Sequence, residues 1–283
     1  MSVPVRKTYK LWIGGKFPRS ESGRTYRPAG CPSCNVARGS RKDLRDAVSA
    51  ARAALPAWSG QSAYLRGQIL YRFAEVLQSR ADSLAAELTA CIALDGASAR
   101  AEVEAAVALA VWYAGLPDKL QTLLGAQNAV SGPFFNFSTV EPTGVVAVAA
   151  PAEPAVLGLV ALLLPVLAGG NTAVVVVSEP APLAGLALGE VLAVSDVPPG
   201  TVNLLSGLHA ELVPEAASHR DVDGLLLAGT PAAEPGRAAA GSVKRVRWAD
   251  LAPDAWRDPG ALQRLSWVEP FVEVKTLWHP VAF

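Results

Sequence analysis

Strand-length and helix-length apolar segments alternate between Val145 and Leu227, and this alternation limits the fold more than any other feature of the sequence. The strand-length segments are apolar at nearly every position, which is typical of strands buried on both faces. Parallel sheets with helices on both sides contain such strands. We therefore predict an α/β fold with a Rossmann-like, doubly wound parallel sheet, a class that often binds a nucleotide at the carboxyl ends of its strands.

The same pattern predicts the boundaries of these elements. We expect strands at Val145–Ala150, Ala173–Val177, Thr201–Leu205 and Val222–Leu227, and helices at Ala155–Ala168 and Leu183–Val194. From Thr230 to Gly241 the apolar periodicity gives way to Pro, Ala, Gly and charged residues. We therefore expect the sheet to end early, with a loop along one edge. A basic, aromatic segment at Lys244–Trp248, an acidic linker and a β-like run at Trp267–Val281 follow.

The part of the chain before this sheet is predicted to contain a hairpin followed by helices. Aromatic and aliphatic residues alternate around a Gly-Gly pair, which predicts a β-ribbon over Lys10–Pro28. Apolar residues then recur at helical spacing over Lys42–Leu94, with Ser40 and Asp82 as the expected N-caps. A further helix is expected at Ala99–Ala114, and strand-like alternation returns at Phe134–Thr139.

Composition excludes several classes of partner. The chain has 25 Lys+Arg against 25 Asp+Glu, and this zero formal charge argues against a nucleic-acid binder. No apolar segment of the secretory type follows the first basic residues, so we expect a cytoplasmic protein. The uncharged stretch Pro154–Ser178 is as long as a membrane span, but Pro165 and Gly169–Asn171 interrupt it. We therefore expect no membrane helix.

The three cysteines are too few for a disulfide framework, and their number suits a reducing compartment. Cys91 lies in a helical pattern and is expected in the core. Cys31 and Cys34 have the CxxC spacing that zinc sites and redox motifs use. Zinc needs four ligands and the sequence offers no second pair, so we expect no metal site. A disulfide between these two cysteines is not expected in a cytosolic protein.

Several segments resemble the aldehyde dehydrogenase superfamily, in the family's own order. Its opening hairpin resembles KLWIGGKFPRSESGRTY, and its paired N-terminal helices resemble residues 46–85. The start of its first cofactor-domain strand, EPxGVV, resembles residues 141–146. Later cofactor-domain segments are similar to LPVLAGGNTAVVVVSEPAP and DVPPGTVNLLSG, and the C-terminal oligomerisation strand is similar to FVEVKTLW. The resemblance covers nearly the whole chain except about residues 230–267.

The resemblance also implies that the catalytic domain is absent. In the family this domain carries the nucleophilic cysteine and is inserted between the cofactor domain and the C-terminal strand. Here AAGSVKRVRWADL resembles the first step into that domain, and the chain then passes to the terminal strand. The sequence contains no GQxC-like segment and no general-base glutamate motif, and Cys91 falls in the N-terminal helices. We therefore expect no catalytic residue.

The cofactor site is expected to be vestigial. The family's pattern is matched at a ribose-binding glutamate and at two phosphate-side glycines, which are Glu179, Gly207 and Gly229. Other cofactor positions of the family are occupied by different residues, namely Val176, His209, Val213, Pro231 and Glu234, and Glu153 takes the place of the family's oxyanion-binding asparagine. A proline without an N–H group and an added carboxylate both oppose binding of a pyrophosphate. We expect no bound cofactor, and NAD(P) only as weak vestigial binding; His209 is expected to be an exposed loop residue without a role.

The resemblance divides the chain into three parts. Residues 1–140 would form an N-terminal helical region with part of an oligomerisation arm, residues 141–243 a degenerate cofactor-type domain, and residues 244–283 a linker and the C-terminal strand of the arm. In the family this arm pairs with the catalytic-domain sheet of the adjacent subunit. An unpaired apolar strand is an aggregation liability. We therefore expect strand addition to a full-length active aldehyde dehydrogenase through Phe271, Val272, Glu273, Val274, Lys275, Thr276, Leu277 and Trp278.

The function that follows is a catalytically inactive aldehyde dehydrogenase-like subunit that assembles with an active NAD(P)-dependent relative and stabilises or regulates it. One alternative is an adenine-nucleotide-binding module without redox chemistry, for which Glu179 and Gly207 are the only positive signs. Another is an active oxidoreductase with a relocated nucleophile, which would need a nucleophile and base in a defined geometry. No nucleic acid, membrane or metal partner is expected.

Overall fold

A five-stranded parallel sheet forms the centre of the computed structural model, which describes residues 8–281. Its order is β10-β9-β6-β7-β8, and the strands are β6 (Val145–Ala149), β7 (Thr172–Val176), β8 (Val202–Leu205), β9 (Gly224–Ala228) and β10 (Arg245–Ala249). Alternate residues of the central strands contribute to two different hydrophobic clusters, one on each face. The prediction of an α/β fold with a doubly wound parallel sheet is therefore confirmed.

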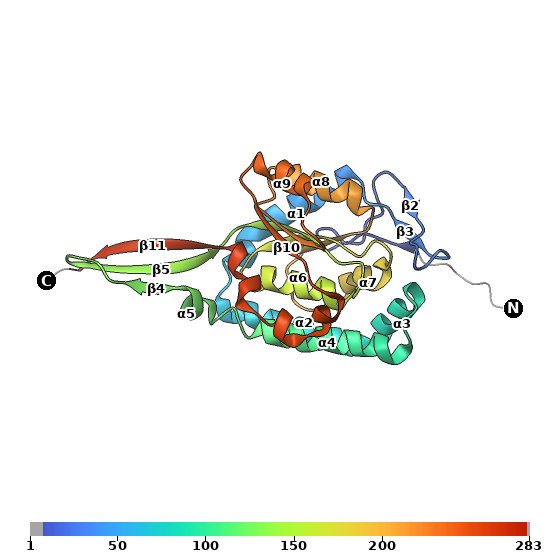
Figure 1. Cartoon of the computed structure of the whole chain (residues 1–283), viewed down its shortest axis with the longest axis horizontal. Coiled ribbons are helices and arrows are strands. Elements are labelled where there is room, and N and C mark those ends of the chain that lie inside the picture. Colours follow the sequence, from blue (N-terminus) through green and yellow to red (C-terminus); the bar gives the residue numbers. More distant parts are fainter. Residues whose placement is uncertain (1–7, 282–283) are drawn as a thin grey trace.

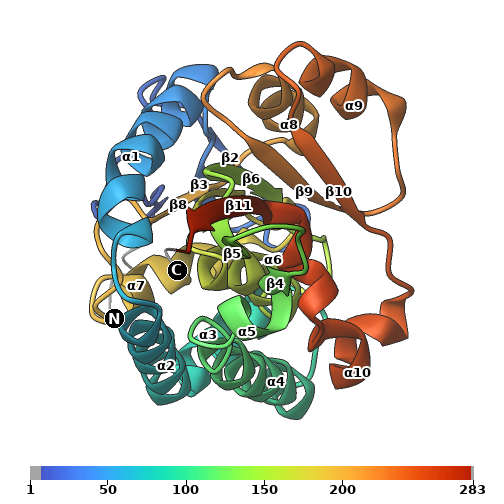
Figure 2. The same ribbon diagram turned by 90° about the vertical axis from the view of Figure 1, so that its left-hand side faces the viewer.

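Helices cover both faces of this sheet (Figure 2). On one face lie α1 (Arg41–Ser59), α8 (His209–Ser218) and α9 (Ala233–Ala240). On the other face lie α6 (Leu157–Ala168) and α7 (Pro182–Leu192), and outside them α2 (Ala63–Ser79), α3 (Ala81–Cys91) and α4 (Gly96–Ala114). Every residue of α6 is buried, which explains why its sequence is apolar all round and contains no charge.

The expectation that the sheet ends early is wrong. After α9, the segment Arg245–Ala249 forms β10 and pairs in parallel with β9. This strand lies at the edge of the sheet, where Val246 and Trp248 pack on the core and two arginines alternate with them. Such alternation does not resemble the continuous apolar runs of the central strands. The parallel sheet thus continues past residue 243, the predicted end of the cofactor-type domain.

The N-terminal ribbon is also more complex than the predicted hairpin. Three short strands, β1 (Thr8–Tyr9), β2 (Thr25–Tyr26) and β3 (Asn35–Ala37), form a sheet in which β1 and β2 each pair with β3 and not with one another. Between them, Trp12 exchanges backbone hydrogen bonds with Leu204 of β8, at 2.9 and 2.7 Å. The N-terminal segment is therefore attached to the β8 edge of the central sheet.

The predicted helix caps differ in outcome. Ser40 caps α1, where it forms a capping box with Asp43, as expected. Asp82 does not cap α3, because it lies in the first turn of that helix after the cap residue Arg80. Asp95 caps α4. No helix within residues 8–281 is both long enough and apolar enough to cross a membrane.

A three-stranded antiparallel arm projects from the body of the protein (Figure 1). Its order is β11-β5-β4, and its strands are β4 (Ala126–Asn128), β5 (Phe134–Pro142) and β11 (Val272–Pro280). The short helix α5 (Leu120–Leu124) lies at its base. Because β11 pairs with β5 along its whole length, from Val272 opposite Pro142 to Pro280 opposite Phe134, only one edge of the terminal strand is free of pairing within the described residues.

The segment between β10 and β11 is short and helical. It contains η1 (Pro253–Arg257), α10 (Pro259–Leu262), η2 (Leu265–Trp267) and η3 (Glu269–Phe271). Trp256, Trp267 and Phe271 are buried in the core, so this segment closes over α6. Asn171, which is fully buried, fixes its end by donating a hydrogen bond to the Phe271 carbonyl at 2.8 Å and accepting one from the Gly144 N–H at 2.8 Å.

Candidate functional site

The residues predicted to remain from a cofactor site all lie at the carboxyl ends of the sheet strands. Glu179 follows β7, Gly207 follows β8 and Gly229 follows β9. This edge is where open α/β sheets bind ligands. Glu179 is hydrogen-bonded to the backbone of His209, which lies two residues after Gly207, so the first two residues are close together. Gly229 is separated from them because β6 lies between β9 and β7.

The side chain of Glu179 is occupied by the start of α8. Its Oε2 accepts a hydrogen bond from the backbone N–H of His209 at 2.8 Å. A carboxylate at a helix N-terminus takes the N–H groups and the partial positive charge that would otherwise attract a phosphate. The chain's own carboxylate therefore stands at the anion-binding end of α8.

His209 is not the exposed loop residue that we expected. It is the first residue of α8 and half-buried, and its Nε2 lies 2.8 Å from the carbonyl oxygen of Val177. A carbonyl can only accept, so Nε2 carries the proton and donates it. The imidazole thus connects α8 to the end of β7. It fills space that would stay open if this position were the glycine that the resemblance to the family implies.

The two glycines lie in different surroundings. A Cβ atom on Gly207 would lie 2.9 Å from the Leu212 side chain and 3.3 Å from the Gly39 nitrogen, so the chain itself packs against this position. The N–H of Gly39 also donates to the Ser206 carbonyl at 2.7 Å. Gly229 has a φ of +105° and no atom within 4 Å of its Cβ position, so there it serves the turn after β9.

None of the three cysteines, all of which the structure describes, is an accessible thiol. Cys91 is 1% exposed, and burial raises the pKa of its thiol to about 11. Cys31 and Cys34 form a disulfide, contrary to our expectation. Two successive turns, in which Cys31 N–H donates to Pro28 O and Cys34 N–H to Cys31 O, bring their Cα atoms to 5.5 Å. No cluster of metal-binding side chains occurs among residues 8–281.

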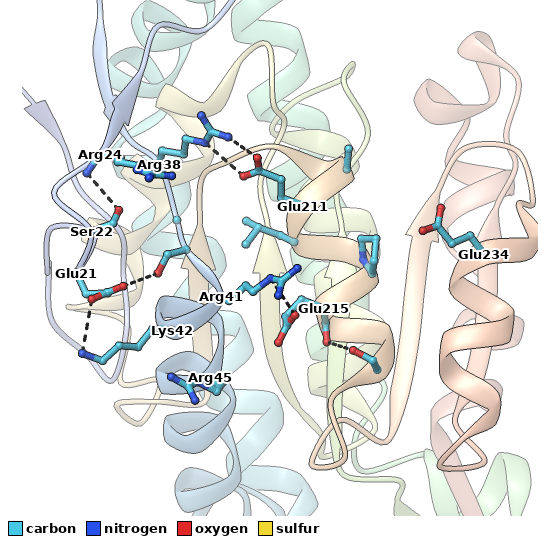
Figure 3. Close-up of a pocket in the computed structure, with 16 residues that line it drawn as sticks. Glu21, Ser22, Arg24, Arg38, Arg41, Lys42, Arg45, Glu211, Glu215 and Glu234 are labelled. Atoms are coloured by element: carbon cyan, nitrogen blue, oxygen red, sulfur yellow. Dashed lines mark hydrogen bonds and ion pairs between the residues drawn. The ribbon is translucent and has the colours of Figure 1, made fainter.

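A charged cleft of about 960 Å³ lies beside α8 (Figure 3). One wall is mainly basic and comes from the N-terminal segment, with Arg24, Arg38, Arg41, Lys42 and Arg45. The facing wall is acidic and consists of Glu211, Glu215 and Glu234. Two ion pairs cross the cleft, Arg38–Glu211 and Arg41–Glu215. Solvent-exposed pairs of this kind contribute little to stability, so they stabilise the docking of α8 on the N-terminal segment only weakly.

Sequence reasoning missed this cleft. Its walls come from segments far apart in the chain, and no local spacing predicts that they meet. Each wall taken alone reads as an ordinary solvated helix or loop surface.

The arm has one protected edge and one open edge. Beyond β4, Gln121 covers β5, because its Nε2 donates to the Ser138 carbonyl at 3.0 Å and its Oε1 accepts from the Val140 N–H at 3.2 Å. The N–H and C=O groups of one residue in an antiparallel strand point to the same edge, and successive residues alternate. The even-numbered residues of β5 therefore face Gln121 and the odd-numbered ones face β11. The register places the odd-numbered residues of β11 opposite the odd-numbered residues of β5, so these residues direct their backbone groups toward β5. Val274, Thr276 and Trp278 therefore direct their N–H and C=O groups outward.

The predicted interface residues fall into three groups. Phe271 and Val272 are 0% and 6% exposed, so their side chains belong to the core and cannot contact a partner. Glu273 and Lys275 form ion pairs with Arg245 and Glu141, and Thr276 is hydrogen-bonded to Ser138 at 3.0 Å. Three are exposed and apolar, and they are Val274 (63%), Leu277 (37%) and Trp278 (59%). Two neighbours on β5 that the sequence reasoning missed are similarly exposed, Phe134 (43%) and Phe135 (44%).

Comparison with known proteins gives one consistent result. Residues 18–247 match the model of the aldehyde dehydrogenase family. The chain is 33% identical over 240 residues to aldehyde dehydrogenase family 2 member B4, mitochondrial, of Arabidopsis thaliana, covering 81% of this chain and 43% of that protein. It is 32% identical over 255 residues to the mitochondrial aldehyde dehydrogenase of Homo sapiens, covering 84% and 47%.

Solved structures agree with this result. A putative aldehyde dehydrogenase from Burkholderia cenocepacia superposes with a TM-score of 0.81 at 29% identity, over 85% of this chain and 50% of that one. PnpE from Pseudomonas sp. WBC-3 superposes with a TM-score of 0.81 at 27% identity, over 86% and 51%. The chain spans about half the length of the curated relatives it matches. On this sequence and structural evidence, the chain belongs to the aldehyde dehydrogenase family.

Proposed function

We propose that this chain is a catalytically inactive aldehyde dehydrogenase-like subunit, which assembles with an active, full-length, NAD(P)-dependent relative and stabilises or regulates it. The observation that carries the proposal is a three-stranded arm with an open outer edge, attached to a body in which no cysteine is an accessible free thiol. Any aldehyde oxidation would belong to the partner subunit.

Inactivity is supported by the state of the cysteines. Nucleophilic catalysis needs a thiolate that a substrate can reach. The Cys91 thiol is buried and its pKa is raised to about 11, while Cys31 and Cys34 are bonded to one another. In addition, short helical turns connect β10 to β11, where the resemblance to the family predicts the catalytic domain.

Assembly is supported by the chemistry of the outer edge of β11. Natural edge strands are protected by charged side chains, by prolines or by bulges. Here the pairing of β11 with β5 continues without a bulge over nine residues, and the one proline of the strand, Pro280, is its last residue. Glu273 and Lys275 are already neutralised within the chain. An extended segment of a partner could therefore add to this edge through backbone hydrogen bonds, with Val274 and Trp278 as apolar contacts.

Nucleotide binding ranks second for a physical reason. Glu179, its main candidate ligand, already caps α8, and Gly207 is packed against Leu212 and Gly39. A nucleotide phosphate would have to displace the carboxylate from the helix N-terminus before it could bind there.

The test is native mass spectrometry of the chain purified gently from its own host, repeated with a Val274→Pro variant and a matched Val274→Ala variant. Proline removes the outward N–H of Val274, whereas alanine keeps it. We expect a complex with a full-length aldehyde dehydrogenase, weakened about fivefold or more by Val274→Pro and less than about twofold by Val274→Ala. A clean homo-oligomer without such a partner would overturn the assembly proposal. Reduction of NAD by the isolated chain with an aldehyde would overturn inactivity.

A further inference from the structure

The Cys31–Cys34 disulfide lies in the connection between β2 and β3, and this connection is packed against two other parts of the chain. A Cβ atom on Gly30 would lie 1.9 Å from the Cys91 carbonyl oxygen at the end of α3, and 2.7 Å from that of Pro180. The N–H of Gly30 donates to the Pro180 carbonyl at 3.2 Å. Tyr26 donates its hydroxyl to the Glu179 carbonyl at 3.2 Å. The disulfide loop therefore contacts the β7–α7 connection directly.

The disulfide contributes little to holding the fold together. A disulfide stabilises a protein mainly by restricting its unfolded chain, and this effect grows with the length of the loop that it closes. Cys31 and Cys34 are separated by only three positions. The local turn is also held by backbone hydrogen bonds of 3.0 Å from Cys31 to Pro28 and from Cys34 to Cys31. The two cysteines would thus stay close together after reduction, and the bond could form again without rearrangement of the chain.

The two cysteines differ in their exposure to solvent. Cys31 is only 4% exposed, whereas Cys34 is half-buried. The Ser33 hydroxyl oxygen lies 3.7 Å from the Cys31 sulfur and can donate to it. A thiolate that arrives from solvent therefore meets Cys34, and the leaving Cys31 thiolate has a hydroxyl donor beside it.

We propose that Cys31–Cys34 is a thiol–disulfide exchange site that reacts with small or protein dithiols, with Cys34 as the sulfur that is attacked. The first thiolate of the dithiol forms a mixed disulfide with Cys34, and Cys31 leaves as a thiolate and takes up a proton. The second thiol of the dithiol loses its proton and displaces Cys34, which leaves as a thiolate and is protonated in turn. Two electrons pass to the cysteine pair, and the dithiol becomes a disulfide.

This chemistry is independent of the assembly proposal. In a reducing compartment, disulfides that do form are mostly transient or redox-sensing, and a short loop with one partly exposed cysteine suits that behaviour. Because Gly30 in this loop contacts Pro180, the redox state of the pair is expected to change the mobility of the β7–α7 connection, at the carboxyl edge of the sheet.

The experiment uses the isolated full chain and dithiothreitol as the probe. The chain is equilibrated under native conditions with different ratios of reduced and oxidised dithiothreitol, alkylated with N-ethylmaleimide and weighed by intact mass spectrometry. We expect two alkylations on the folded chain after reduction, reversed by oxidised dithiothreitol, while Cys91 reacts only in denaturant. In a Cys91→Ala variant only Cys31 and Cys34 can be alkylated, so the number of alkylations reports on this pair alone. Amide hydrogen exchange of residues 179–183 is expected to accelerate on reduction.

Single-cysteine variants test which sulfur is attacked. With Cys91→Ala as background, Cys31→Ser leaves Cys34 and Cys34→Ser leaves Cys31. We expect the remaining Cys34 to be alkylated at least about tenfold faster than the remaining Cys31. Two alkylations without any reductant, or reduction that requires denaturant, would overturn the proposal, and the second result would identify a purely structural bond. Neither result depends on a partner, so failure here is distinguishable from failure of the assembly proposal.

Discussion

Glu102 on α4 is a carboxyl group enclosed by the protein, with only 4% of the residue exposed. Its Oε1 accepts the N–H groups of Val156 and Leu157 at 2.8 and 3.3 Å, at the start of α6, but its Oε2 is buried without a hydrogen-bond partner. Burial raises the pKa of Glu102 and outweighs the lowering effect of these two hydrogen bonds. Glu102 thus connects α4 to α6, but its burial disfavours the ionised form of the carboxyl group.

The pH dependence of stability follows from this raised pKa. For an acid whose pKa is higher in the folded state than in the unfolded state, the stabilising contribution is complete below the unfolded pKa of about 4.3 and is lost as the pH rises through the folded pKa. We expect Glu102→Gln, which keeps an acceptor for both N–H groups, to gain stability relative to the native chain as the pH rises.

Urea unfolding from pH 5 to 8 measures this prediction, with Glu104→Gln as the control on the exposed face of the same helix. The control is expected to change stability by less than about 0.5 kcal/mol at every pH. A difference between Glu102→Gln and the native chain that stays constant with pH would contradict the assignment of a raised pKa.

Asn171 shows how a single side chain can join the two ends of the domain. It binds the Gly144 N–H, the Val166 carbonyl and the Phe271 carbonyl at 2.8, 3.1 and 2.8 Å. Replacement by alanine removes the partner of the buried Gly144 N–H, whereas the Val166 and Phe271 carbonyls keep backbone hydrogen bonds from Asn171 and Thr143. We therefore expect Asn171→Ala to destabilise the protein by about 2 kcal/mol. Urea unfolding checks this value against Asn35→Ala, a change at an exposed asparagine. A loss below about 1 kcal/mol would mean that Asn171 does not hold the terminal segment in place.

At the scale of elements, α8 is held by the contact between Glu179 and its first N–H group. A capping carboxylate contributes about 1 kcal/mol. We expect Glu179→Ala to lower the free energy of unfolding by about this amount, and we expect calorimetric titrations with NAD and ATP to show no micromolar binding before or after the change.

The matched control for Glu179→Ala is Glu153→Ala, because Glu153 is exposed and no hydrogen bond or ion pair involves it among the described residues. If NAD binds to the native chain and Glu179→Ala weakens that binding without loss of stability, Glu179 is a ribose ligand rather than a cap. That outcome would move nucleotide binding ahead of assembly.

The elements that could be predicted are those whose environment is simple. The central strands and α6 are buried on all sides, so their sequences are continuously apolar and their positions follow from that pattern. β10 was not predicted, because an edge strand has only one buried face and its sequence is not continuously apolar. α8 was not predicted, because it starts at His209 and contains Pro214, and a proline inside a segment argues against a helix. The disulfide and the cleft depend on turns and distant contacts, which local periodicity does not encode.

At the scale of the whole molecule, the open edge of β11 should also affect the isolated chain. Val274 and Trp278 are 63% and 59% exposed on a strand whose outer backbone groups have no partner strand among residues 8–281. Such an edge associates with other edges unless a charge prevents it. We expect sedimentation velocity of the isolated chain to show concentration-dependent association, and Val274→Lys to abolish it with a change in unfolding free energy below about 0.5 kcal/mol.

Val194→Lys is the control for this effect, because Val194 is 52% exposed but lies after α7, away from the arm. It is expected to leave the association unchanged. A native chain that remains monomeric at all concentrations, or equal loss of association in both variants, would contradict a role for the edge. Because the same backbone groups are proposed to receive the partner strand, adding the full-length subunit should suppress self-association of the native chain and leave the Val274→Lys chain unbound.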